Sequence, residues 1–221
     1  AEVAGWAAYG MSDQLTLLGQ DEASNRVRAT HVLGGTYTPH CAALQPFSLV
    51  VGLGAAVASR GVTIHEGTEV TAIEQGRVTT TRGTVRADVV VRATEGFTPT
   101  LPGVHREVVP MYSLMVATEP LSDDLWEHIG LAERETFSDK RHLRIYGQRT
   151  ADGRIAFGGR GAPYHWGSSV QPGHDLDDRV HAMLRRILVG LFPALGGARF
   201  THAWGGNLGI PRDWTPSVAF D

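Results

Sequence analysis

Four aromatic side chains could line a pocket for a positively charged amine: Tyr112, Tyr146, Tyr164 and Trp166. An aromatic ring attracts a cation through its electron-rich face, which suits recognition of an ammonium group. Packing between strands is the alternative role for such residues, and it is the one we favour for Tyr112. We keep Tyr146 and Trp166 as candidates for a substrate pocket.

A second group of candidates lies in the loop after Tyr37. His40 could contact a substrate, or it could be a hydrogen-bonded structural residue. Cys41 is a candidate nucleophile, although its neighbours are not of the kind that activate a thiol. The other histidines are scattered without H-E-x-x-H spacing, so we expect no metal site. No G-x-S-x-G motif is present, which argues against a serine hydrolase.

A turn of small residues, Ala93-Thr94-Glu95-Gly96, would let the backbone approach a ligand closely. Valine, isoleucine and threonine dominate the segment before it, and glycines punctuate that segment. The pattern predicts strands at Val62–His65, Thr68–Glu74, Arg77–Thr81 and Val85–Ala93. The last of these contains Val89-Val90-Val91, a continuous apolar run that predicts burial on both faces.

The rest of the chain predicts further strands and helices. One helix begins at Gln45-Pro46, and another carries Asp175 as its cap with Asp178 at the capping-box position. A mixed or antiparallel sheet is expected from Arg28–Gly35, Val108–Glu119, Thr136–Gln148, Arg154–Gly159 and Arg199–Trp204. The predicted fold class is therefore α+β.

Composition narrows the classes of protein. Hydrophobic residues are 42% and charged residues 19%, so the chain should fold. The net charge is −3 with no basic patch, which argues against nucleic-acid binding. The longest apolar run, Leu49–Ala58, is too short to span a membrane. A single cysteine and no visible signal peptide fit a reducing compartment, and we expect a cytoplasmic protein.

The order and spacing of these segments resemble the D-amino-acid oxidase-like (DAO) family of FAD-dependent oxidoreductases. The resemblance covers nearly all of the chain, and the phrase from Thr38 to Ala42 is similar to the γ-glutamylputrescine oxidoreductase-like branch. It implies FAD as cofactor and a small amine or amino acid as substrate. A carbon next to nitrogen would lose a hydride to the flavin.

The resemblance also implies roles for particular residues. Val70, Ala93, Thr94 and Gly96 match family positions that contact the cofactor. Glu95 departs from the family, which has glycine there, and its carboxylate would repel a pyrophosphate unless it points away. Leu208 stands where amino-acid oxidases carry an arginine for the substrate carboxylate. This departure favours an amine over an α-amino acid.

Domain organisation follows from the same resemblance. Residues 1–40 and 102–203 would form the substrate domain, 41–101 the middle of the FAD-binding domain, and 204–221 the return toward it. The family's G-x-G-x-x-G turn is matched only by Gly52 and Gly54, inside a predicted helix. We therefore expect a fragment lacking the N-terminal glycine unit and the C-terminal flavin segment, with exposed apolar surface that favours a homodimer. The alternative is an inert substrate-binding domain without cofactor.

Overall fold

The structure, a computed structural model, describes residues 2–160 and 162–220. These residues form two compact units, each built from separate stretches of chain. The first unit comprises 2–43, 114–160 and 176–205, and the second comprises 44–113, 162–175 and 206–220. Helices and antiparallel sheets occur together, which confirms the α+β class. The assignment of the units to substrate and FAD-binding domains stays a prediction.

A five-stranded sheet organises the first unit, and two of its strands continue into the second. The strand order is β10-β6-β9-β8-β7, with bounds β6 (Val108–Thr118), β7 (Thr136–Ser138), β8 (Ile145–Arg149), β9 (Ile155–Gly159) and β10 (Phe200–Pro211). The single strand predicted at Thr136–Gln148 is wrong, because the chain reverses between β7 and β8. The carboxylate of Asp139 accepts hydrogen bonds from the backbone and side chain of Arg141, which closes this reversal.

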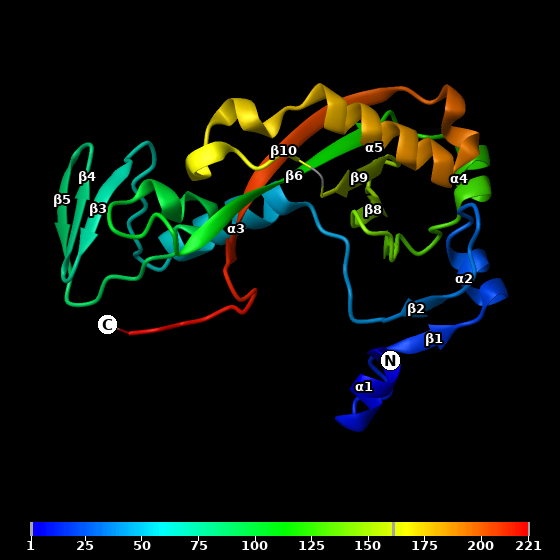
Figure 1. Cartoon of the computed structure of the whole chain (residues 1–221), viewed down its shortest axis with the longest axis horizontal. Coiled ribbons are helices and arrows are strands. Elements are labelled where there is room, and N and C mark those ends of the chain that lie inside the picture. Colours follow the sequence, from blue (N-terminus) through cyan, green and yellow to red (C-terminus); the bar gives the residue numbers. More distant parts are fainter. Residues whose placement is uncertain (1, 161, 221) are drawn as a thin grey trace. The chain divides into compact units, whose positions relative to one another are not determined.

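Helix α5 (Asp178–Leu191) covers one face of this sheet (Figure 1). Val180, Leu184 and Leu188 are buried along it. They pack with the sheet residues of the core, among them Leu114, Val116, Ile155 and Phe157. The side chain of Asp177 caps the helix by accepting from Arg179 N at 2.9 Å and Val180 N at 3.0 Å. The predicted cap, Asp175, is wrong, because it ends the preceding short helix η3 (Pro172–Asp175).

The other elements of the first unit are short: α1 (Glu2–Ala8), β1 (Thr16–Leu18), α2 (Gln20–Arg26), β2 (Gly35–Tyr37), α4 (Asp123–Ile129) and η4 (Pro193–Gly197). Strands β1 and β2 pair with each other rather than with the large sheet. The strand predicted at Arg28–Gly35 is therefore wrong over most of its length. The backbone N–H groups there bond to helix ends instead, as Arg28 N donates to Ile129 O and Thr30 N to Leu191 O.

The second unit contains a three-stranded antiparallel meander, in which β3 (Val70–Glu74), β4 (Arg77–Thr80) and β5 (Gly83–Arg86) follow in order. Ile73, Val78 and Val85 lie opposite one another in register. The strand predicted at Val62–His65 does not form, and the one predicted at Val85–Ala93 covers only the end of β5. Val89 and Val91 of the valine run are exposed, Val91 at 82%, and Val90 is half-buried. Its burial would require a neighbouring strand, and the described residues provide none.

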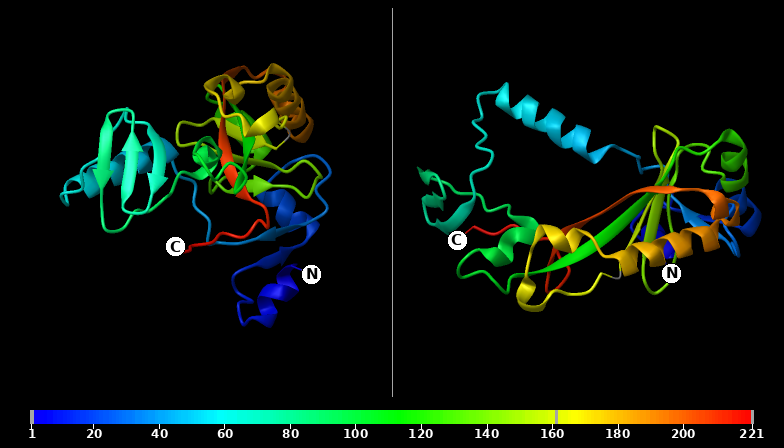
Figure 2. Two further views of the ribbon diagram at one scale, coloured as in Figure 1. Left: turned by 60° about the vertical axis from the view of Figure 1, so that its left-hand side comes forward. Right: turned by 90° about the horizontal axis from the view of Figure 1, so that it is seen from above.

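Helix α3 (Pro46–Ala58) also belongs to the second unit. The side chain of Gln45 caps it by accepting from Ser48 N at 2.7 Å. Its sequence carries no charged residue, yet all of its side chains are at least partly exposed. Figure 2 shows α3 standing apart from the three-stranded sheet of its unit. Within the described residues, no helix has both the length and the apolar character needed to cross a membrane.

Candidate functional site

Tyr146 lies on the sheet face that α5 does not cover. Its partner across the ladder is Gly158, and Gly158 in turn lies opposite Met115 of β6. A methyl group at Gly158 would lie 2.6 Å from Cε2 of Tyr146 and 2.8 Å from Cγ of Met115. Because Gly158 has no side chain, the Tyr146 ring and the Met115 side chain can both lie over strand β9. Tyr146 keeps 37% of its surface exposed.

The small-residue turn of the second unit forms a short helix, η1 (Glu95–Thr100), packed against β10. Hydroxyl groups of Thr94 and Thr98 are hydrogen-bonded at 2.8 Å. The side chain of Asn207 donates to Gly96 O at 3.3 Å. A methyl group at Gly96 would lie 2.9 Å from Cγ of Asn207. A side chain at Gly96 would therefore displace the side chain of Asn207.

Glu95 fastens this turn to β10. One carboxylate oxygen accepts from Gly209 N at 2.9 Å, and the other accepts from Gly96 N. Glu95 itself has a φ of +46°, a region that few non-glycine residues adopt. Its carboxylate therefore points to β10. The N–H of Gly96 already donates a hydrogen bond to Glu95, so it is not free to bind a cofactor. Gly96 could therefore contact a cofactor only by van der Waals packing of its backbone.

Val70 begins β3 at an irregular point of the ladder. It pairs with Thr80, but the register shifts between Val70 and Ala72. A bulge of this kind leaves one residue outside the regular pairing, and such bulges occur next to binding sites. The side chain of Thr71, the extra residue, donates to Thr79 O at 3.3 Å. The position is compatible with the predicted cofactor contact, which stays a prediction.

Sequence analysis missed a cluster of three rings in the second unit. His165 and His174 stack face to face with 3.4 Å between ring centroids, and Tyr112 meets their edges at 5.2 and 5.5 Å. Tyr112 is buried, which confirms the packing role expected for it. Burial raises the pKa of Tyr112, the hydrogen bond from Gln171 N opposes this, and the nearby Asp175 raises it further. Nothing in the spacing of the two histidines predicts their stacking.

The remaining predicted pocket residues do not share one site within a unit. His40 is exposed in the first unit, where its backbone N–H donates to the Thr38 hydroxyl at 3.2 Å. Trp166 begins η2 (Trp166–Ser168) in the second unit and is 92% exposed. Cys41 is a free, exposed thiol. Among residues 2–160 and 162–220, no cluster of three or more histidine, cysteine and acidic side chains could hold a metal.

Comparison with known proteins decides the family. The family model described as FAD dependent oxidoreductase (DAO) matches residues 1–220. The chain belongs to the DAO family. This confirms the expected resemblance, and the family's cofactor is FAD.

Relatives support the membership. The chain is 32% identical over 207 residues to the "probable oxidoreductase OrdL" of Rhizobium meliloti (strain 1021). It is 27% identical over 207 residues to the gamma-glutamylputrescine oxidoreductase of Escherichia coli (strain K12). Each alignment covers 91% of this chain and 46% of the relative. The chain therefore spans about half the length of these curated relatives.

Solved structures show the same fold. The L-proline dehydrogenase of P. horikoshii superposes with a TM-score of 0.78 at 18% identity, over 96% of this chain and 57% of that one. Glycine oxidase from Geobacillus kaustophilus gives a TM-score of 0.77 at 21% identity, over 96% and 55% of the two chains. The DAO fold is thus the fold of this chain.

The residues fit FAD in part. Ala93 is exposed and Thr94 half-buried in the turn that Glu95 holds against β10. Helix α3 offers no glycine turn at its start, because Gly52 and Gly54 lie in its interior and Gln45 already satisfies Ser48 N. Contact of Val70, Ala93, Thr94 and Gly96 with FAD stays a prediction.

Proposed function

We propose that the protein is an FAD-dependent oxidoreductase that oxidises a C–N bond of a small amine or amino-acid-like substrate. The observation that carries the proposal is the DAO family match over residues 1–220. The relative named gamma-glutamylputrescine oxidoreductase supports an amine as the substrate. Leu208, at the position where amino-acid oxidases of the resemblance carry arginine, also favours an amine over an α-amino acid.

In this reaction the substrate nitrogen first loses a proton to solvent and becomes the free amine. The carbon next to it then loses a hydride to FAD, and the C–N bond becomes the C=N⁺ bond of an iminium ion. FAD, when bound, supplies the acceptor for the two electrons. The contribution of the chain is to bind and orient. The exposed ring of Tyr146 would receive the ammonium group, because a cation is attracted to an aromatic face. Glu95 would keep the cofactor turn in place through Gly209 and Gly96.

The test is a visible absorption spectrum of the purified full-length protein, followed by oxidation assays with small amines and α-amino acids. A flavin spectrum that bleaches on addition of an amine without air is the expected result. A protein that carries no flavin, and takes up none when FAD is added, would refute the proposal. Faster reduction by α-amino acids than by amines would refute the substrate preference alone.

A second candidate concerns residues 1–221 produced alone: an inert substrate-binding domain. It is favoured by α3, whose interior glycines leave no pyrophosphate-binding turn in the described residues. We propose that this polypeptide binds FAD weakly and oxidises nothing. Titration of the polypeptide with FAD, followed by flavin fluorescence, tests this. Tight stoichiometric uptake would contradict it.

Partners and location are also proposed. The exposed apolar side chains of α3 support self-association into a homodimer. The net charge of −3 supports a small-molecule partner rather than a nucleic acid. The free, exposed thiol of Cys41 supports a reducing, cytoplasmic location. Fractionation of cells followed by detection of the protein in the cytoplasmic fraction tests the location.

A further inference from the structure

The residues on both sides of Leu208 are bound to the turn that contains Glu95 and Gly96. The backbone N–H of Gly209 donates to one carboxylate oxygen of Glu95 at 2.9 Å. The side chain of Asn207 donates to Gly96 O at 3.3 Å. Leu208 lies between these two contacts, and its own side chain stays 47% exposed. The turn therefore sets the position of the Leu208 backbone.

Glu95 forms this connection in a strained backbone conformation. Its φ of +46° lies in the region that glycine adopts much more readily than other residues. Glycine at this position could not bond to β10, because only a side-chain acceptor reaches Gly209 N and Gly96 N together. Strained residues of this kind are concentrated at functional sites. The strain at Glu95 is thus the cost of a contact that glycine cannot make.

The two ends of the turn differ in accessibility. Gly96 is buried, and a methyl group there would lie 2.9 Å from Cγ of Asn207. Ala93 is exposed and Thr94 is half-buried. Asn207 of β10 thus closes the end of the turn, and the start of the turn remains accessible. A ligand bound at Ala93 and Thr94 would restrain the backbone that leads directly into Glu95.

We propose that Glu95 is a positioning residue, which couples binding of FAD at the turn to the position of Leu208 on β10. The proposal rests on the proposed oxidase function and on the predicted contact of Ala93 and Thr94 with FAD. FAD that restrains the turn also restrains the Glu95 carboxylate, so the hydrogen bond from Gly209 opens less often. Coupling between two sites is reciprocal, so the loss of this bond weakens FAD binding by the same factor.

The test is hydrogen exchange of the full-length protein with and without FAD, after an absorption spectrum has established that FAD is bound. FAD should slow exchange of residues 206–211 about threefold to tenfold, the effect of one hydrogen bond. Glu95→Gly relieves the strain and should fold, but it should lose this slowing and bind FAD more weakly by about the same factor. Glu95→Gln should keep most of the slowing, because its amide oxygen still accepts from Gly209 N.

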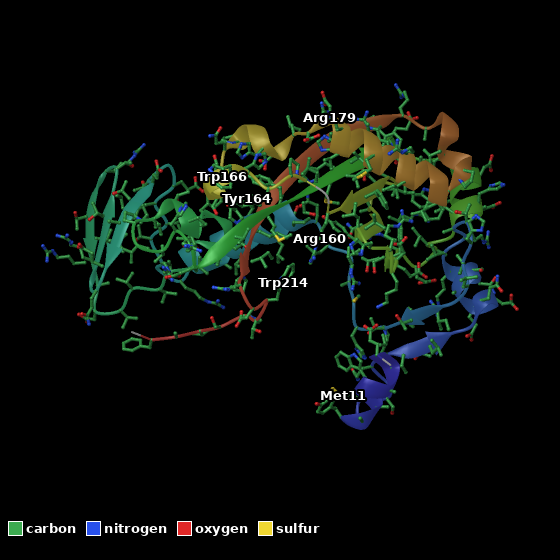
Figure 3. All side chains as sticks on the ribbon, viewed as in Figure 1. Met11, Arg160, Tyr164, Trp166, Arg179 and Trp214 are labelled. Carbon is green, nitrogen blue, oxygen red and sulfur yellow. The ribbon has the colours of Figure 1, made fainter. Side chains whose placement is uncertain are left out.

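Asp177→Ala is the matched control. The Asp177 carboxylate also accepts from two backbone N–H groups, those of Arg179 and Val180 at the start of α5, where Figure 3 labels Arg179. The control loses bonds of the same kind in the first unit and should leave the slowing by FAD unchanged.

Three results would overturn the coupling: undiminished slowing in Glu95→Gly, no slowing in the wild type with FAD bound, or an equal loss in Asp177→Ala. A full-length protein that binds no FAD would refute the proposed function and the coupling with it. The absorption spectrum distinguishes that failure from the other three, because FAD is bound in each of those.

Discussion

The carboxylate of Glu95 accepts a hydrogen bond from the backbone N–H of Gly209, 2.9 Å away and 114 residues later in the chain. The other oxygen accepts from Gly96 N, so a single side chain fixes both the turn and its neighbour. A methyl group at Gly209 would lie 2.7 Å from the backbone of Glu95, which shows how closely the two segments approach. The acidic residue that departs from the family pattern is thus part of the scaffold.

Two replacements of Glu95 should distinguish the contribution of its hydrogen bonds to stability from the cost of its backbone strain. Glu95→Ala loses both bonds and keeps the unfavourable φ of +46°, so we expect a loss of about 1 kcal/mol for this exposed site. Glu95→Gly loses the bonds but relieves the strain, so it should be more stable than the alanine variant by up to about 1 kcal/mol. Urea unfolding measures both. An alanine variant as stable as the wild type would show that the Glu95 bonds contribute nothing.

Gly158→Ala should disturb the open face of the sheet. The added methyl group would lie 2.6 Å from the Tyr146 ring and 2.8 Å from Met115, so the ring must move. We expect a destabilisation of about 1–3 kcal/mol, as for other overpacked sites. Gly196→Ala is the control, because a methyl group there meets nothing within 4 Å. Thermal unfolding of the two variants should differ clearly, and equal midpoints would contradict the geometry.

His174 should tolerate phenylalanine better than alanine. Its Nδ1 is buried without a hydrogen-bond partner among the described residues, and its ring stacks on His165. Phenylalanine keeps the stacked ring and removes the unpaired nitrogen, so its effect on stability should be near zero. Alanine loses the ring contacts and should cost about 0.5–1.5 kcal/mol. Guanidinium unfolding distinguishes them, and the reverse order would show that Nδ1 has a partner in solution.

Glu119 should make the stability of the fold depend on pH. Hydrogen bonds from the side chain and then the backbone N–H of Arg199 lower the pKa of Glu119 below its ordinary 4.5. A carboxyl group with a lowered pKa stabilises the fold above its unfolded value, and this is lost as pH falls through the folded value. The stability difference between wild type and Glu119→Gln should therefore be constant above about pH 4.5 and shrink below it. A difference that grows on acidification would contradict the sign.

Charge on α3 should reduce self-association. Leu49 and Leu53 lie one turn apart on the helix and are 56% and 61% exposed. Leu49→Lys/Leu53→Lys should lower the mass of the 1–221 polypeptide measured by light scattering, because two charges oppose apolar contact. Thr84→Lys on the exposed strand β5 is the control and should leave the mass unchanged. A wild-type polypeptide that is monomeric at every concentration would refute the dimer.

Local patterns in the sequence determined much of the fold. Proline and the apolar run predict α3, and glycines at the turns predict the β3–β5 meander, because these preferences act between near neighbours. The family resemblance, and with it FAD, also followed from the order of segments alone. Tyr146 was a candidate from its residue type before its position on the open face was known.

Tertiary contacts decided the rest. The valine run before Arg92 predicts burial, but burial needs a neighbouring strand, and the described residues supply none. The Glu95–Gly209 bond and the His165–His174 stack join residues whose separation carries no periodic signal. Such contacts depend on strand register and loop path, which the whole fold sets. The sequence therefore determined the elements and the family, and the packing of distant segments decided which side chains meet.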